Sequence, residues 1–295
     1  NYGVAIELFG SGRNSHHAKE LDRFRTISFG QTRGDFALHG IQGIFLSQMR
    51  PLVVIEEPRS YRNFDSGEDL KSFRVTVETS DLFVKALHPL EAQTEALIRQ
   101  CRSLIEQSIG LRLEFLKSLI PIQAHPEDSV VACRMIQASS KAGVGPMAAV
   151  AGAVAEYVGR GLMTYSDEVL IENGGDLFIF AKRKIVVGIY AGSSPFSNKI
   201  GLRIDSTPIP LGISTSSGRV GPSKSFGKAD AATIVSSDPI LADAVATATA
   251  NRIIRHSDLA SACQWAISIE GVRGCLTIMD DKMAALGDIE LIAVN

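Results

Sequence analysis

The stretch "EVLIENGGDLFIF", residues 168–180, holds two runs rich in Val, Leu, Ile and Phe around two adjacent glycines. Such runs favour β-strands. Paired glycines weaken a strand, so they mark a hairpin bulge or a point where a ligand or another chain approaches the backbone. Acidic and amide residues on either side supply polar groups to this opening. We therefore expect strands here and a candidate site at Gly174, Gly175 and Asp176.

Further β-forming runs lie on both sides of this stretch. The segment "FRVTVETSDLFVKAL", residues 73–87, predicts a hairpin that turns around Glu78–Asp81. The other expected strands are short and are joined in part by tight turns. They cover residues 185–190, 200–205, 209–215, 228–237, 265–270, 274–280 and 289–295.

Helices are expected between these strands. Residues 90–119 carry apolar side chains at helical spacing and predict two helices that meet near Gly110. Residues 126–143 predict a helix that starts on a proline–acid signal and stops at glycine. Residues 143–162 predict a Gly- and Ala-rich helix, whose small residues suit either tight packing against a sheet or a wall facing a flat ligand. Together these patterns predict an α+β fold, with a mixed, largely antiparallel sheet packed with several helices.

The length of 295 residues suffices for one large domain or two ordinary ones. We expect a single domain over residues 1–295. Within it, turn formers and mixed charges separate the short apolar pieces of residues 1–70. This N-terminal part is therefore expected to be irregular and to pack on the rest.

Composition excludes whole-chain disorder and a general attraction to polyanions. Apolar residues make up 45% of the chain and charged residues 21%, close to the average of globular proteins. The 30 basic and 32 acidic residues give a formal charge of −2, so no overall field draws the chain to nucleic acid or to an anionic membrane. The four cysteines show no C-x-x-C pair, and no apolar run reaches about 18 residues. These features favour a reduced, cytoplasmic chain; whether it forms a homo-oligomer stays open.

The segment "STSSGRVGPSKSFGKAD", residues 214–230, is a loop rich in Ser and Gly between two expected strands. Its cations are Arg219, Lys224 and Lys228, and its backbone N–H groups could hold a phosphate as anion-binding nests do. It is not a Walker A loop, which places four residues between its glycines and ends in Lys-Ser/Thr. Two interpretations remain, an anion-binding loop and a flexible solvated one.

A lone carboxylate, Asp243, stands among small residues in "LADAVATATAN", residues 241–251. A helix is expected over 239–256, with Asp238 as its N-cap and a proline at its first position. Thr247 follows Asp243 by four residues and therefore shares its face. A carboxylate and a hydroxyl one turn apart form half of a site for a hard cation such as Mg²⁺. A buried aspartate bonded to a neighbouring loop satisfies the same facts.

Taken in this order, "ENGGD", the "TSSG" loop and "ADAVATA" resemble the ApbE family, flavin transferases that take FMN from FAD and attach it to a threonine or serine of a target protein. The similarity is clearest over roughly residues 143–251. A closer likeness covers most of the chain from about residue 73 to residue 251. It is to an uncharacterised, cytoplasmic branch of ApbE-like proteins with "ETSDLFV", "GVGPMAAVAGAVAE", "VLIENGGDLFI" and "SFGKADA".

The resemblance implies an ApbE-like fold and one pocket for a flavin or a related nucleotide. It assigns Mg²⁺ to Asp243 and Thr247, against the FAD pyrophosphate, where a metal would stabilise the charge that leaves as FMN is transferred. It assigns the G-G-D turn and the S-G loop to the same ligand, FAD or FMN. The residues that the resemblance assigns to ligand binding are Gly174, Gly175, Asp176, Ser216, Ser217 and Gly218. The loop cations Arg219, Lys224 and Lys228 would contact the phosphates of the same ligand.

Two departures from the family pattern leave the activity open. The transferases carry an H-I-x-D-P-x-T-G segment after the S-G loop, whereas "GPSKSFGKADA" stands there in this chain. Their small-residue helix begins D-x-x-G-I-A-K-G, whereas this one begins "AGVGPMAAVAG". Three interpretations therefore stand: Mg²⁺-dependent FMN transfer or FAD pyrophosphate cleavage, a non-catalytic flavin- or nucleotide-binding module, and a vestigial pocket in a structural protein. No catalytic residue is assigned.

Overall fold

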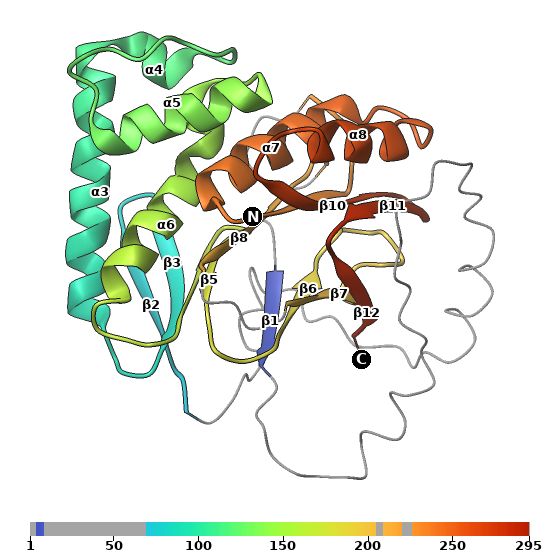
Figure 1. The fold of residues 1–295 in the computed structure, drawn as a ribbon, viewed down its shortest axis with the longest axis horizontal. Coiled ribbons are helices and arrows are strands. Elements are labelled where there is room, and N and C mark those ends of the chain that lie inside the picture. Colours follow the sequence, from blue (N-terminus) through green and yellow to red (C-terminus); the bar gives the residue numbers. More distant parts are fainter. Residues whose placement is uncertain (1–3, 9–68, 205–208, 220–225, 295) are drawn as a thin grey trace.

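The computed structural model describes residues 4–8, 69–204, 209–219 and 226–294 (Figure 1). Its strands form two sheets. The larger sheet contains β2 (Lys71–Val77), β3 (Ser80–Ala86), β4 (Val169–Asn173), β5 (Asp176–Phe180), β8 (Leu211–Ser216), β9 (Ala231–Ser236), β10 (Val272–Met279) and β11 (Lys282–Gly287). The smaller sheet contains β1 (Val4–Leu8), β6 (Ile185–Ile189), β7 (Ile200–Ile204) and β12 (Glu290–Ala293).

Every strand pair in the described residues is antiparallel. The spatial order is β11-β10-β9-β8-β5-β4-β3-β2 in the large sheet and β1-β6-β7-β12 in the small one. The helices are α3 (Glu91–Leu111), α4 (Leu113–Lys117), α5 (Val130–Ala142), the 3₁₀ turn η2 (Pro146–Ala149), α6 (Val150–Leu162), α7 (Pro239–Arg252) and α8 (Asp258–Ile267). The expectation of an α+β fold with a largely antiparallel sheet is confirmed.

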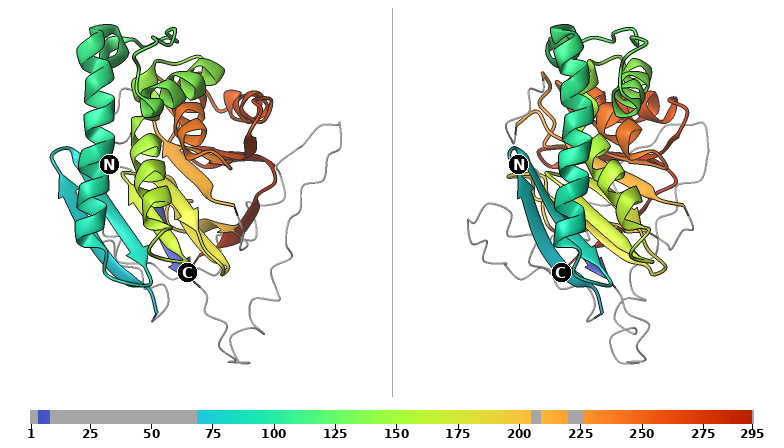
Figure 2. Two further views of the ribbon diagram at one scale, coloured as in Figure 1. Left: turned by 60° about the vertical axis from the view of Figure 1, so that its left-hand side comes forward. Right: turned by 90° about the vertical axis from the view of Figure 1, so that its left-hand side faces the viewer.

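The helices gather on one face of the large sheet, and the small sheet lies against the other (Figures 1 and 2). Residues of the central strands alternate between these two layers, as the period of two in a strand requires. In β4, Val169 and Ile171 pack with the helices, whereas Leu170 packs with the small sheet. In β5, Phe178 faces the helices and Leu177 faces the small sheet. Because both faces are covered, the central strands read as continuous apolar runs.

Several expected elements are confirmed. Residues 73–87 form the β2–β3 hairpin, and residues 90–119 form two helices that part at Arg112. Residues 143–162 contain η2 followed by α6. Asp238 caps α7 as expected, since its Oδ1 accepts hydrogen bonds from two backbone N–H groups of the first turn.

One expected strand and two helix boundaries were wrong. Residues 265–270 are not a strand; Trp265–Ile267 end α8, whose buried residues recur at helical spacing. Helix α5 starts at Val130, because the Ser129 hydroxyl accepts a hydrogen bond from the N–H of the third helical residue and caps it there. Helix α7 stops at Arg252 and not at residue 256. The next residue, Ile253, is extended, and its carbonyl oxygen accepts a hydrogen bond from the Lys228 N–H.

Residues 9–68 lie outside the described residues, so the expectation of an irregular N-terminal part and of one domain over 1–295 stays a prediction. Strand β11, which was not expected, extends the large sheet at its edge. All four cysteines are free, and three of them are buried. Among the described residues, none of the helices combines the length and the apolar character that crossing a bilayer requires.

Candidate metal and nucleotide site

A row of polar side chains crosses one end of the large sheet. Asn173 pairs with Asp176 across the β4–β5 hairpin, and Asp176 pairs with Ser214 on β8. Cross-strand partners point to the same face. That face is the helix layer, because the Asn173 amide donates a hydrogen bond to the Ala151 carbonyl of α6. Sequence reasoning missed Ser214, although its place two residues before Ser216 on one strand gave it the same face.

The paired glycines form the two-residue turn of this hairpin. Gly174 and Gly175 have φ values of 69° and 114°, which favour glycine, and the register runs through without a shift. The bulge interpretation is therefore wrong, and a tight turn replaces it. A side chain at Gly174 would meet no atom within 4 Å, so this turn borders open space. The Gly175 N–H donates a hydrogen bond to Glu172 Oε1 at 3.1 Å, which fixes the second residue of the turn.

Helices α6 and α7 touch at Gly152, next to this row. A Cβ atom at this position would lie 2.5 Å from the Pro239 carbonyl oxygen and 2.8 Å from the Asp243 Cβ. The Phe178 ring fills the corresponding space at Gly159, 2.3 Å from an added Cβ. Protein atoms therefore occupy the space beside these glycines. Of the two interpretations of the small-residue helix, tight packing is the one the structure favours at these positions.

This close approach lets Asp243 cap a helix that is not its own. The N-cap residue of α6, Ala149, makes no side-chain capping bond. Instead, Asp243 Oδ2 accepts a hydrogen bond from the Gly152 N–H at 2.8 Å. The first N–H groups of a helix lack partners and attract negative charge. Asp243 therefore has the structural partner that its lone position in the sequence called for.

The capping bond leaves Asp243 beside a second buried carboxyl group, Asp176. Each residue is only 9% exposed. Burial raises the pKa of Asp243 to about 7, while the N–H groups of Gly152 and Ala151 and a bond from Asp176 oppose the rise. Burial and then the neighbouring Asp243 raise the pKa of Asp176 well above its ordinary value. Two carboxyl groups this close are therefore held together by a shared proton or by a bound cation.

Thr247 stands one turn from Asp243 and is the one residue of Pro239–Ala250 that is not buried. The helix thus leaves a threonine partly exposed, one turn from the carboxyl group that lies beside Asp176. Among the described residues, no group of three His, Cys, Asp or Glu side chains could hold a metal ion. Two carboxylates and a hydroxyl nevertheless fit Mg²⁺, which commonly takes one or two carboxylates and completes its six oxygen ligands with phosphate and water.

The S-G loop is fixed by the fold at its start. The Ser217 hydroxyl donates to the Ala229 carbonyl at 3.0 Å. A Cβ at Gly218 would lie 2.0 Å from the Gly227 carbonyl oxygen, so glycine allows the two arms of the loop to meet. Ser216 ends β8 on the helix side of the sheet, in line with Ser214. Lys224 lies outside the described residues.

The charge of Arg219 is already paired. Its Nη1 lies 2.5 Å from Asp280 Oδ1 and 3.3 Å from the buried Asp230. Hydrogen bonding to the Arg219 guanidinium, and to a smaller extent to His256, lowers the pKa of Asp280. Asp230 ends this loop segment and precedes β9, whereas Asp280 follows β10, is distant along the chain and had no signal in the loop sequence. Lys228 is exposed, and of the two cations in the described part of the loop it is the one that forms no ion pair.

Comparison with known proteins found a matching sequence family. The family model described as "AbpE bacteria" matches residues 62–270. A "UPF0280 protein" of Methanothrix thermoacetophila is 38% identical over 220 residues, which cover 74% of this chain and 91% of that protein. A "UPF0280 protein" of Methanocella arvoryzae is 40% identical over 206 residues, covering 70% of this chain and 82% of that protein.

Two solved structures are also similar. The apo form of the Pseudomonas stutzeri flavinyl transferase ApbE has a TM-score of 0.49 and 11% identity, covering 74% of this chain and 94% of that chain. The flavin transferase ApbE from Vibrio cholerae has a TM-score of 0.40 and 11% identity, covering 74% and 97%. The sequence matches define an ApbE-like protein. Within that superfamily, the chain belongs to the family described as "AbpE bacteria".

Proposed function

We propose that this chain binds a flavin nucleotide, FAD or FMN, through Mg²⁺ held by Asp243, Asp176 and Thr247. The observation that carries the proposal is the buried carboxyl pair, which has no cationic side chain among its described partners. The ligand class comes from the family resemblance and from the names of the similar transferases. A small nucleotide, and not a nucleic acid or a membrane, is the expected partner in a cytoplasmic protein.

A divalent cation suits this pair for an electrostatic reason. Ionising both carboxyl groups without a counter-charge places two like charges in a buried site, which is costly. A cation would remove that cost, and a pyrophosphate could approach it past Thr247, which is partly exposed. When bound there, Mg²⁺ would neutralise charge on the pyrophosphate oxygens. Asp243 would then hold the metal with one oxygen and the start of α6 with the other.

The surroundings of the pair suit a flat ligand beside a phosphate. Met147, Ala148, Val150 and Ala151, at the start of the helix that Asp243 caps, are only partly buried. The Gly174 turn offers open space on the neighbouring strand end. We propose that apolar contact with Met147, Ala148, Val150 and Ala151 positions the flavin ring. We propose further that the exposed Lys228 meets the phosphates, together with Lys224.

The reaction that this arrangement supports best is FMN transfer from FAD or cleavage of the FAD pyrophosphate. In that reaction Asp243, Asp176 and Thr247 would hold the metal, which would supply charge neutralisation at the pyrophosphate. Binding without chemistry is the second candidate. Two observations favour binding without chemistry. The H-I-x-D-P-x-T-G segment of the transferases is replaced here, and Arg219 already forms ion pairs with two carboxylates.

Incubation with FAD separates the two candidates. Protein, FAD and Mg²⁺ are mixed, and AMP, FMN and flavin-labelled protein are measured by chromatography and mass spectrometry. Release of AMP that stops in Asp243→Asn and in EDTA supports the enzyme. Mg²⁺-dependent FAD binding without AMP supports the binding module. Asp167→Asn, at an exposed carboxylate paired with Lys182, is the matched control and should change neither result. Absence of both binding and turnover contradicts the proposal.

A further inference from the structure

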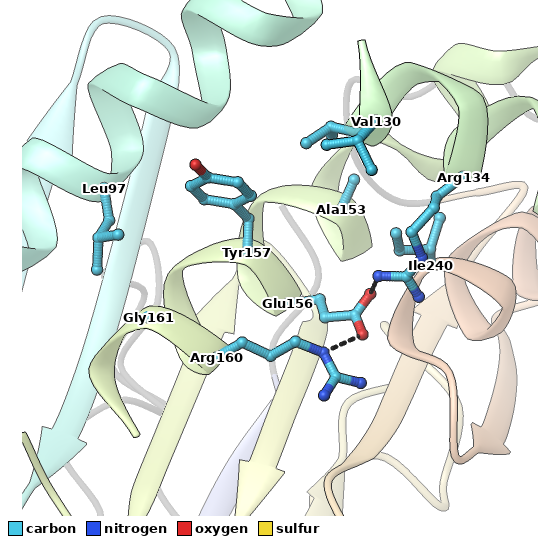
Figure 3. A pocket seen from close by; sticks show the side chains of 10 residues that line it. Leu97, Val130, Arg134, Ala153, Glu156, Tyr157, Arg160, Gly161 and Ile240 are labelled. Carbon is cyan, nitrogen blue, oxygen red and sulfur yellow. Dashed lines mark hydrogen bonds and ion pairs between the residues drawn. The ribbon is translucent and has the colours of Figure 1, made fainter. Parts of the chain in front are cut away.

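A groove opens on the helix layer among α3, α5, α6 and the start of α7 (Figure 3). Its volume is about 400 Å³, within the range of small-ligand sites. One end is apolar and is formed by Leu97, Tyr157 and Ala153. The other end carries the side chains of Arg134 and Arg160 (Figure 3). The groove therefore joins an apolar wall to a cationic end.

A buried glutamate holds both arginines in place. Glu156 is 1% exposed, and its carboxylate forms ion pairs of 2.6 Å with Arg134 Nη1 and with Arg160 Nε (Figure 3). Arg134 also lies 3.3 Å from the α7 cap, Asp238. A buried carboxylate requires such partners, so the guanidinium groups are fixed before any ligand arrives. Fixed donors lose little conformational entropy on binding.

Arg160 retains donors for a ligand. It bonds Glu156 through Nε, and none of the hydrogen bonds of the described residues uses its Nη1 or Nη2. Its side chain is 50% exposed. A guanidinium presents parallel N–H groups that match the two oxygens of a carboxylate. An apolar body can lie against the Tyr157 ring while the carboxylate reaches the arginine.

We propose that this groove is a second binding site, for a small carboxylic acid with an aryl or branched alkyl body. The carboxylate binds the Nη groups of Arg160 beside Arg134, and the body packs on Tyr157, Leu97 and Ala153. The site needs neither Mg²⁺ nor a nucleotide, so it does not depend on the proposed function.

The probe is phenylacetate, and phenylacetamide is its uncharged match. Binding to the whole chain is measured by ligand-observed NMR and by titration calorimetry. Phenylacetate should bind at least about tenfold more tightly than the amide, because a charge-assisted bidentate pair is lost with the carboxylate. Arg160→Met should weaken phenylacetate by a similar factor. Arg273→Met, at an exposed arginine paired with Asp288, should leave the affinity unchanged.

A second pair of variants avoids any loss of folding. Val130 is 67% exposed at the rim of the groove, one helical turn before Arg134. Val130→Glu should add a negative charge at the rim of the groove, repel the carboxylate of the probe and weaken phenylacetate several-fold, whereas Val130→Gln should not. Asp243→Asn should bind the probe normally, which keeps this test separate from that of the metal site. Equal binding of acid and amide, unchanged binding in Arg160→Met or Val130→Glu, or no binding at millimolar probe overturns the proposal.

Discussion

Removing divalent cations should make the stability of this protein fall as the pH rises. The pKa of Asp243 is raised from 3.8 to about 7 by burial, so the folded state holds a proton that the unfolded state releases. The stabilising effect of that proton is fully present below about pH 4 and is lost as the pH rises through about 7. At ~1.4 kcal/mol per pKa unit, the loss is on the order of 4 kcal/mol between those limits.

Chemical unfolding in EDTA at pH 5, 6, 7 and 8 measures this loss. Most of it should appear between pH 5 and pH 8, and Mg²⁺ should restore stability at pH 8 far more than at pH 5. Asp243→Asn keeps an oxygen that can accept from the Gly152 N–H but carries no charge. It should therefore flatten the pH dependence by at least half and remove the response to Mg²⁺.

Asp167→Asn serves as the control, since hydrogen bonding to Lys182 lowers the pKa of that exposed carboxyl and moves its titration below this range. A wild-type stability that stays level between pH 5 and pH 8 in EDTA would refute the reasoning. So would the same slope in Asp243→Asn.

Three further changes test the packing around the pair. Gly152→Ala should cost about 2 kcal/mol of unfolding free energy in a denaturant titration, because the new methyl meets the α7 backbone at 2.5 Å. Gly110→Ala is its control: nothing lies within 4 Å of the new methyl, so the change should stabilise the protein by up to about 1 kcal/mol. Thr247→Val should weaken Mg²⁺ affinity about tenfold by calorimetry, whereas Thr249→Val, whose hydroxyl bonds its own helix, should not change it. Asp238→Ala removes the bonds to two N–H groups of α7 and should lower stability by about 1–2 kcal/mol.

Local signals in the sequence were sufficient for much of the fold. The Asp-Pro start of α7 and the β-forming runs of residues 73–87 each depend on neighbours within a few residues. The paired glycines marked an interruption between two strands, but the bulge expected there is a tight turn. Residues 265–270 were misjudged because a short apolar run fits a strand and a buried helix end equally well. The end of α7 was misjudged for a different reason. The Ile253 carbonyl accepts a hydrogen bond from the Lys228 N–H, in a loop that the helix sequence does not reveal.

The candidate site shows the same division. Helical spacing was enough to place Thr247 beside Asp243, and the structure adds Asp176 from a strand about 70 residues earlier. The pairing of Arg219 with Asp230 and Asp280 joins strand ends that no periodicity relates. Contacts of this kind follow from the register of the sheet, which the sequence does not reveal locally.

Calorimetric titration of FAD into the protein, in Mg²⁺ and in EDTA, tests the carboxylate site most directly. We expect FAD to bind in Mg²⁺ and to bind at least tenfold more weakly in EDTA, with Asp243→Asn equally weak in both buffers. Equal FAD affinity with and without the metal, or full affinity in Asp243→Asn, would contradict the proposal that Asp243 and Asp176 hold a cation against a pyrophosphate.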